Sequence, residues 1–215
     1  MLPDLPRAQW AMLAGLGALL LLCQIDQPFP KTAWLHHVPT LIALLAAPFA
    51  LSRRPISNAA LGCLIAFLAL HTIGGRYTYS AVPYDQVARA LTGTGISEAF
   101  GLSRNHYDRL VHLSYGLLTV LPVREVLERH FGLTRRVSLY IAFESVLAVG
   151  AVYEMFEWLL TLMAAGPTAA AYNGQQGDIW DAQKDMALAA LGALIVLGLS
   201  LRNRRPAVLK STTAQ

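Results

Sequence analysis

The chain has 215 residues, of which 55% are hydrophobic and 14% are charged, and its mean hydropathy is +0.44. Ordinary soluble domains carry about 25% charged residues, so this composition excludes an ordinary soluble domain and predicts a membrane protein. Lys and Arg outnumber Asp and Glu by 17 to 13, a net charge of +4. In a membrane protein such a surplus sets orientation, and we expect no nucleic-acid partner. Cys23 and Cys63 both lie in apolar segments, which excludes a disulfide framework.

Six apolar segments lie between charged or turn-forming boundaries. In chain order they cover residues 8–23, 34–51, 56–73, 110–123, 137–163 and 186–201. The first has no small-residue cleavage pattern after it, so we interpret it as a retained span and not as a signal peptide. The sequence therefore predicts an all-α, polytopic membrane protein with a bundle of six transmembrane helices.

Basic residues predict how these spans are oriented. They gather in every second connection: Arg53 and Arg54, then Arg124, Arg129, Arg135 and Arg136, then Arg202, Arg204, Arg205 and Lys210. The positive-inside rule then places both termini in the cytoplasm and residues 26–33, 74–106 and 164–184 outside. We expect one transmembrane domain over residues 1–205 and a disordered cytoplasmic tail over residues 206–215.

The outer connection over residues 74–106 is too long for a bare loop. It begins with a turn-rich, aromatic stretch, and its second half carries spaced apolar residues. Val87, Ala88, Leu91, Ile96 and Phe100 predict an amphipathic element at the membrane interface.

Ionisable residues of several spans fall at one depth. The fourth and sixth apolar segments are too short to cross a bilayer, so their helices must include polar residues at the outer end. Counted along straight helices from the nearest inner arginine, Asp108 lies about 24 Å up, and His71, Glu154 and Asp185 about 26 to 27 Å. His112 lies deeper, at about 18 Å. Such groups must face one another or a wet cavity, because exposure to lipid is too costly.

Three kinds of site fit this cluster. As catalytic candidates it offers Asp108, His112, Glu154, Glu157, Asp181 and Asp185. The ligands of a divalent metal cofactor would be His71, Asp108, His112 and Glu154, since imidazole nitrogens and carboxylates on neighbouring helices are what a metal site in a bundle needs. For substrate binding we select Arg76, Arg109, Gln176 and Asp178, because arginines at the outer side suit the phosphate of a lipid head group or polyprenyl carrier.

Two other interpretations stay open. The polar residues form a satisfied network that holds helices together, or they belong to a proton or ion pathway. Below the outer cluster the sequence offers only Glu144, about 12 Å above Arg136, so no relay to the cytoplasm is visible and we expect the site to open outward. Near the last span, Gly177 and Asp178 are typical of a helix start, but Asp185 lies two turns further in and is not explained as a cap.

Four segments carry a resemblance to a known family. They are HTIGGRYTY over residues 71–79, RNHYDRLVH over 104–112, EMFEW over 154–158 and QGDIWDAQKD over 176–185. Together they resemble the YjdF-like bacterial inner-membrane family, a domain of unknown function, over essentially the whole chain. The resemblance implies a multi-pass protein of the bacterial cytoplasmic membrane. A more distant likeness is to VanZ-like membrane proteins, whose Asp-Lys-x-x-His pattern corresponds to Asp108 through His112, with Arg109 in place of the Lys, Glu154 as the next acid, and Asp181 or Asp185 as the last.

The leading functional hypothesis is an inner-membrane protein with an outward-opening His/Asp/Glu site that processes or handles a cell-envelope lipid or lipid-linked substrate. Its expected partners are the lipid bilayer and a phospholipid or lipid-linked envelope intermediate. The alternatives are a small proton-coupled transporter and a non-catalytic membrane protein whose polar cluster is structural.

Overall fold

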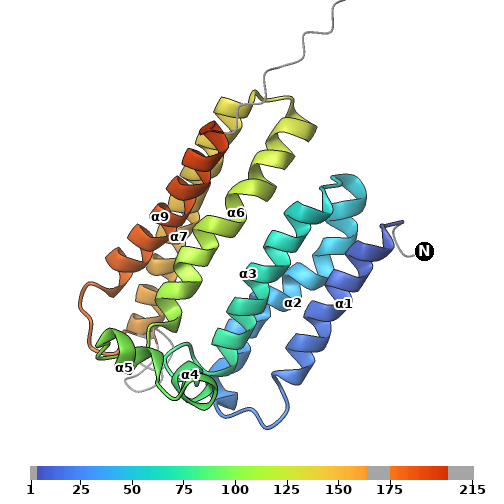
Figure 1. Cartoon of the computed structure of the whole chain (residues 1–215). Coiled ribbons are helices and arrows are strands. Elements are labelled where there is room, and N and C mark those ends of the chain that lie inside the picture. The colour runs from blue at the N-terminus through green and yellow to red at the C-terminus, as the bar shows by residue number, and fades with distance from the viewer. Residues whose placement is uncertain (1–3, 164–174, 203–215) are drawn as a thin grey trace, which may run out of the picture.

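The computed structural model describes residues 4–163 and 175–202, and every regular element in these residues is a helix (Figure 1). The helices are α1 (Arg7–Leu22), α2 (Pro30–Arg53), α3 (Asn58–Arg76), α4 (Tyr84–Thr92), α5 (Ile96–Phe100), α6 (Tyr107–Phe131), α7 (Arg135–Met163) and α9 (Asp181–Arg202). The expected disordered tail over residues 206–215 and most of the expected outer connection over residues 164–184 lie outside the described residues.

The long helices form two groups of three that meet along α3 and α6. Helices α1, α2 and α3 contact one another, and so do α6, α7 and α9 (Figure 1). Contacts between helix ends fix their directions: Ser57 at the start of α3 donates to Glu125 near the end of α6, and Arg135 at the start of α7 donates to the Ser200 carbonyl near the end of α9. The starts of α3 and α7 and the ends of α6 and α9 therefore lie at the same end of the bundle.

Five of the described helices are long and apolar enough to cross a membrane: α2, α3, α6, α7 and α9. Helices α2, α6, α7 and α9 each contain one expected apolar segment, and α3 begins two residues inside its segment and extends beyond its end. Helices α6 and α9 begin with polar residues, as predicted. The all-helical, multi-pass prediction is thus confirmed. Helix α1 has 16 residues and is shorter than the other five, so the sixth crossing stays a prediction.

One connection differs from the sequence prediction. Arg124 and Arg129 were expected in the loop between the fourth and fifth spans, but α6 continues through both to Phe131. Ion pairs at i, i+4 explain the extension, because Arg124 pairs with Glu128 at 3.5 Å and Arg129 with Glu125 at 3.0 Å along the helix surface. The helix ends where the backbone enters the left-handed conformation at residue 132, a glycine with φ 67°.

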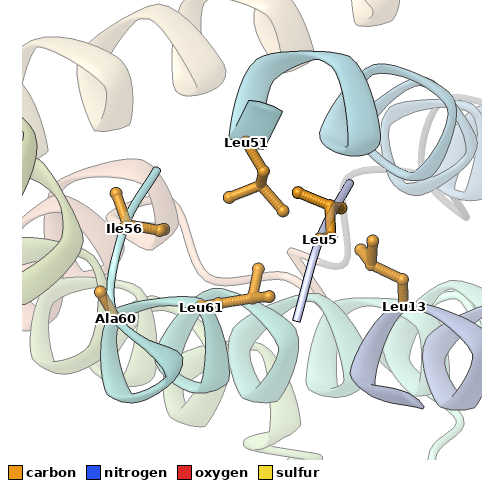
Figure 2. Close-up of a cluster of buried hydrophobic side chains, with 6 residues drawn as sticks. All are labelled: Leu5, Leu13, Leu51, Ile56, Ala60 and Leu61. Atoms are coloured by element: carbon orange, nitrogen blue, oxygen red, sulfur yellow. The ribbon is translucent and has the colours of Figure 1, made fainter. Parts of the chain in front are cut away.

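Buried apolar side chains hold each group of helices together. Figure 2 shows the cluster in the first group, at the end of the bundle where α1 begins. It consists of Leu5, Leu13, Leu51, Ile56, Ala60 and Leu61. A second cluster joins α6, α7 and α9 and consists of Val120, Leu139, Ala142, Val146, Ala189 and Ala193. Large apolar side chains such as Leu45 and Val152 are exposed on the outer faces of α2 and α7, as expected of surfaces that contact lipid.

The long connection between α3 and α6 contains a pair of short helices at one end of the bundle (Figure 1). Helix α4 places Val87 and Leu91 on one face, one turn apart and exposed. Ion pairing between Arg89 and Glu98 at 2.9 Å joins α4 to α5. The predicted ordered element is therefore confirmed, while its contact with the membrane interface stays a prediction.

Candidate functional site

The site depends on the close approach of α6 and α9. A Cβ added at Gly116 of α6 would lie 1.9 Å from the Ala189 carbonyl oxygen, and one at Gly192 of α9 would lie 2.3 Å from the Leu113 carbonyl oxygen. Only glycine fits such backbone contact, which is how small residues serve helix packing in membranes. His112 precedes Gly116 by four residues, so the same face of α6 that touches α9 carries the polar residues at its outer end.

Arg109 of α6 connects to the start of α9 through three carboxylates. Its Nη2 lies 2.6 Å from Asp181 Oδ1 and 3.0 Å from Asp178 Oδ2, and its Nη1 lies 2.5 Å from Asp185 Oδ1. Arg109 is 9% exposed and Asp185 2% exposed. A buried arginine with this many acceptors holds α9 in fixed register with α6. Asp185, which the sequence does not explain as a helix cap, is thus an ion-pair partner of Arg109.

The outer edge of this network is closed by Arg104 and Lys184. Arg104 Nη1 donates to Asp181 Oδ1 at 2.8 Å, and Lys184 Nζ donates to both oxygens of Asp178 at 2.9 and 2.7 Å. The Lys184 hydrogen bonds lower the pKa of Asp178 to about 2. Gln176 exchanges two hydrogen bonds of 3.0 Å with the backbone of Asn105. These contacts join the segment before α9 to the segment before α6.

A second set of polar groups surrounds His112 on the inner side of the Arg109 network. His112 Nε2 lies 3.6 Å from Asp108 Oδ1 and 3.8 Å from Glu154 Oε1. Asp108, His112 and Asp185 each offer a ligand atom, and the three atoms lie within 4.8 Å of one another. The structure thus places Asp108 and His112 of α6 near Asp185 of α9, and His112 near Glu154 of α7.

The two sets differ in how well their charges are satisfied. Every carboxylate of the Arg109 network faces a basic side chain within 3.0 Å. Glu154, which is 9% exposed, has an Oε1 atom that is buried and makes no hydrogen bond. Distances of 3.6 and 3.8 Å to an imidazole nitrogen are also too long for hydrogen bonds. Asp185 Oδ1 and Arg104 Nη2 are also buried without a hydrogen bond, but Asp185 Oδ1 has an ion pair of 2.5 Å with Arg109. The carboxylates of the His112 set differ in that their ion-pair distances to His112 are 3.6 and 3.8 Å.

His71 lies near this set with both ring nitrogens engaged. Its Nε2 donates to the His36 carbonyl at 2.8 Å, which leaves Nδ1 to accept a short hydrogen bond from the Tyr79 hydroxyl. Tyr79 reaches back to α3 because residue 74 is glycine: a Cβ there would lie 2.7 Å from the tyrosine ring. With these partners His71 has no nitrogen left for a metal, and the ligand role predicted for it is not favoured by the geometry.

An apolar cavity of about 260 Å³ lies between the two helix groups and reaches these residues. Its polar lining consists of His71, Tyr79, Asp108 and His112. The rest of its wall is aromatic or aliphatic and comes from α2, α3, α6 and α7: Pro39, Phe67, Leu68, Val111, Tyr115, Val149, Gly150 and Tyr153. An ionisable pair thus stands in the wall of an otherwise apolar space at membrane depth.

Two further sequence candidates are Arg76 and Glu157. Arg76 donates to the Cys23 carbonyl at 2.8 Å and the Ile25 carbonyl at 2.7 Å, so its guanidinium closes the end of α1. Glu157 lies one turn beyond Glu154 on α7 and lines a second hollow together with Trp158 and with Glu154 and Asp181 of the cluster. For Arg76, Arg109, Gln176 and Asp178 the structure shows contacts within the chain, and contact with a substrate stays a prediction.

Several residues of the site were not selected from the sequence. Tyr79 and Tyr153 are bulky aromatic residues, which are common in membrane proteins and carry no local signal of a cavity. Gly116 and Gly192 were not predicted as contact points between helices either. The available signal was that Gly116 lies four residues after His112, on the same face of a membrane-spanning helix, where small residues allow close packing. The adjacent glycines at 74 and 75 were the one local signal that a side chain approaches α3.

Comparison with known proteins places the chain among inner-membrane proteins. Residues 8–206 match the family described as "Predicted membrane protein (DUF2238)". The chain belongs to this family. It is 36% identical over 166 residues to the inner membrane protein YjdF of Escherichia coli (strain K12), which covers 76% of this chain and 75% of that protein. No solved structure matches. Membership and fold together make this DUF2238 protein a multi-pass helical protein of the bacterial inner membrane, and the likeness to VanZ-like proteins stays a prediction.

Proposed function

We propose that the protein binds a cell-envelope lipid or lipid-linked intermediate in the cavity between its helix groups and processes its polar group at His112 and Asp108. The observation that carries this proposal is the composition of the cavity wall, in which four polar residues, His71, Tyr79, Asp108 and His112, interrupt an apolar and aromatic surface. Asp108 and His112 form a histidine–carboxylate pair within it. Binding sites for small molecules commonly combine such a wall with a few convergent polar groups.

The apolar part of the cavity suits a hydrocarbon chain. A volume of about 260 Å³ accommodates roughly ten methylene groups at about 27 Å³ each in a close-packed interior. Each buried methylene contributes about 0.8 kcal/mol when it leaves water, but a chain that enters from the bilayer gains from shape and packing contacts instead. The substrate class is therefore one whose chain already lies in the membrane and whose polar group needs placing.

The polar wall suits acid–base chemistry on that group. His112 is the residue type that exchanges protons near neutral pH, and Asp108, one turn before it, lies 3.6 Å from its Nε2. A carboxylate in this position orients an imidazole and stabilises its protonated form. In this role His112 and Asp108 contact the polar group of the lipid from the cavity wall, as free acid–base groups or as ligands of a bound ion, and the Arg109 network holds α9 against α6.

The orientation of the site is part of the proposal. Arg53, Arg54, Arg135 and Arg202 lie at the ends of α2, α7 and α9 that are opposite to the cluster. With six spans, including α1, the positive-inside rule places this basic end and both termini in the cytoplasm. The cavity and the polar cluster then lie in the outer leaflet, where a cell-envelope intermediate is presented.

A photocrosslinking experiment tests the proposal. Gly150 lines the cavity, and a Cβ added there meets no atom within 4 Å, so Gly150→Leu fills the cavity without a backbone clash. Membranes carrying the protein are labelled with a diazirine phospholipid and, separately, with a diazirine polyprenyl phosphate. The leucine side chain occupies space that a bound chain needs, so labelling should fall for whichever probe is bound.

The matched control is Gly198→Leu, because Gly198 of α9 is exposed and also has no atom within 4 Å of a built Cβ. This control should label as the parent protein does. His112→Gln should keep the labelling and lose conversion of the bound lipid, followed by mass spectrometry of extracted lipids. Equal labelling of Gly150→Leu and Gly198→Leu with both probes would contradict the proposed binding.

A further inference from the structure

The ion pairs among the described residues leave two carboxylates of the polar cluster without a close Arg or Lys. Asp178, Asp181 and Asp185 are matched by Arg104, Arg109 and Lys184, all in ion pairs of 2.5 to 3.7 Å. Asp108 and Glu154 remain, and the basic group that lies near both, at 3.6 and 3.8 Å, is the imidazole of His112. Two carboxylates at membrane depth are costly unless a positive charge compensates them. A divalent cation supplies the missing charge.

The spacing around His112 also fits an ion better than hydrogen bonds. Two ligand atoms that are each about 2.1 Å from one metal ion stand about 3.4 Å apart at a tetrahedral angle. His112 Nε2 is 3.6 Å from Asp108 Oδ1 and 3.8 Å from Glu154 Oε1, a few tenths of an ångström wider than this. Asp185 offers an oxygen within 4.8 Å of the Asp108 and His112 ligand atoms.

One carboxylate oxygen independently points to a ligand in this space. Glu154 Oε1 is fully buried and makes no hydrogen bond within the described residues, and Glu154 as a whole is 9% exposed. Leaving a buried oxygen without a partner costs as much as a lost hydrogen bond or more. The same oxygen is the atom directed at His112 Nε2, so the place between them is where a partner is needed.

We propose that His112 Nε2, Asp108, Glu154 and Asp185 bind one divalent metal ion between α6, α7 and α9. One imidazole nitrogen with carboxylate oxygens is a donor set for Zn²⁺, Mn²⁺ or Fe²⁺, while Cu⁺ prefers thiolates and thioethers. Arg109 orients the Asp185 carboxylate through its 2.5 Å contact, as groups around a metal site commonly orient the ligands. His71, whose nitrogens already have partners, is not a ligand in this arrangement.

Elemental analysis of the full chain tests the metal site. The protein is produced in cells supplied with Zn²⁺, Mn²⁺ and Fe²⁺ and is purified in mild detergent without chelator, through an affinity tag that contains no histidine. We expect about one divalent metal ion per chain. His112→Gln and Glu154→Gln, which keep side-chain volume while removing a ligand, should each lower metal content by roughly tenfold or more.

The matched controls are His130→Gln and Glu98→Gln, a histidine at the opposite end of α6 and a carboxylate of the α4–α5 pair. Both should retain the parent metal content. Folding of each variant is checked separately by its thermal unfolding temperature after EDTA and again after added Zn²⁺ or Mn²⁺. The unfolding temperature should rise on metal addition in the parent and the controls and should not respond in Glu154→Gln.

Two results would overturn the metal site. One is a parent protein that contains no divalent metal and whose unfolding temperature ignores added Zn²⁺ and Mn²⁺, in which case Asp108 and Glu154 are neutralised by protons instead. The other is equal loss of metal from the controls and the His112 variant, which indicates surface binding. Lipid labelling is measured without reference to metal content, so failure of this proposal and failure of the lipid proposal are separate outcomes.

Discussion

The backbone contact between α6 and α9 gives the most quantitative prediction. In Gly116→Ala the new Cβ would lie 1.9 Å from the Ala189 carbonyl oxygen and 2.7 Å from the Ala193 nitrogen. These are backbone atoms of α9 and cannot rotate away. To reach an ordinary contact of 3.4 Å from 1.9 Å, the two helices must separate locally by about 1.5 Å.

That separation affects the polar cluster as well as the packing. Arg109 reaches Asp181 and Asp185 across this interface at 2.6 and 2.5 Å, so a shift of this size stretches both ion pairs. Overpacking of a close-packed interior costs about 1 to 3 kcal/mol. For a chain of this size each kcal/mol corresponds to about 2 to 4 °C in the unfolding temperature. We therefore expect Gly116→Ala to lower that temperature by several degrees.

Thermal unfolding in mild detergent, followed by tryptophan fluorescence, measures this effect. The matched control is Gly198→Ala, also in a helix, where a Cβ meets nothing within 4 Å. Because alanine is the better helix former, the control should be unchanged or slightly more stable. A Gly116→Ala protein as stable as the Gly198→Ala protein would refute the close contact of α6 and α9 from which the site is built.

Three further predictions concern the polar network and the topology. Arg109→Met leaves buried carboxylates without their partner and should destabilise the protein by about 3 to 5 kcal/mol. The loss of folded protein is followed by size-exclusion profiles in detergent. If the unpaired carboxylates are the cause, adding Asp185→Asn should restore part of the folded protein. The pKa of Asp178 falls to about 2 from 3.8, so its ionised form stabilises the fold above pH 3.8 and this contribution is lost as the pH falls toward 2. Asp178→Asn should therefore lower the unfolding temperature equally at pH 7 and pH 5, and a smaller effect at pH 5 contradicts the assignment. In a background without the native cysteines, Ser80→Cys should react with an impermeant maleimide on intact cells and Thr134→Cys should not; the reverse would place the cluster on the cytoplasmic side.

The membrane-spanning helices could be predicted well because each contains a long apolar run, and the two runs too short for a bilayer required the polar residues before them. In lipid, backbone N–H and C=O groups must hydrogen-bond within the protein, and a single apolar run meets this requirement by forming a helix. The end of α6 was predicted less well. Arg124 and Arg129 were interpreted as loop residues because charge usually ends a span, but their partners one turn away, Glu128 and Glu125, let the helix continue.

The candidate site was predicted in part. Counting residues along helices gives the depth of a side chain, and this was enough to expect Asp108, His112, Glu154 and Asp185 at one level. Depth does not say which neighbours a side chain faces. The sequence therefore could not separate the acids that Arg109 satisfies from the carboxylates that face His112, and it grouped His71 with possible metal ligands.

What the sequence by itself determined is the class of the protein: helical, multi-pass, and with ionisable residues near one end of its spans. These properties follow from local composition and from spacing along a helix, which no tertiary contact changes. Tertiary structure alone decided the partners. The glycines of α6 and α9 let the two backbones come into contact, and the Tyr79 hydroxyl hydrogen-bonds to His71. Glu154 of α7 places a buried oxygen in the site that makes no hydrogen bond within the described residues. Rotation of each helix about its axis sets those contacts, and that rotation is fixed only when the helices pack against one another.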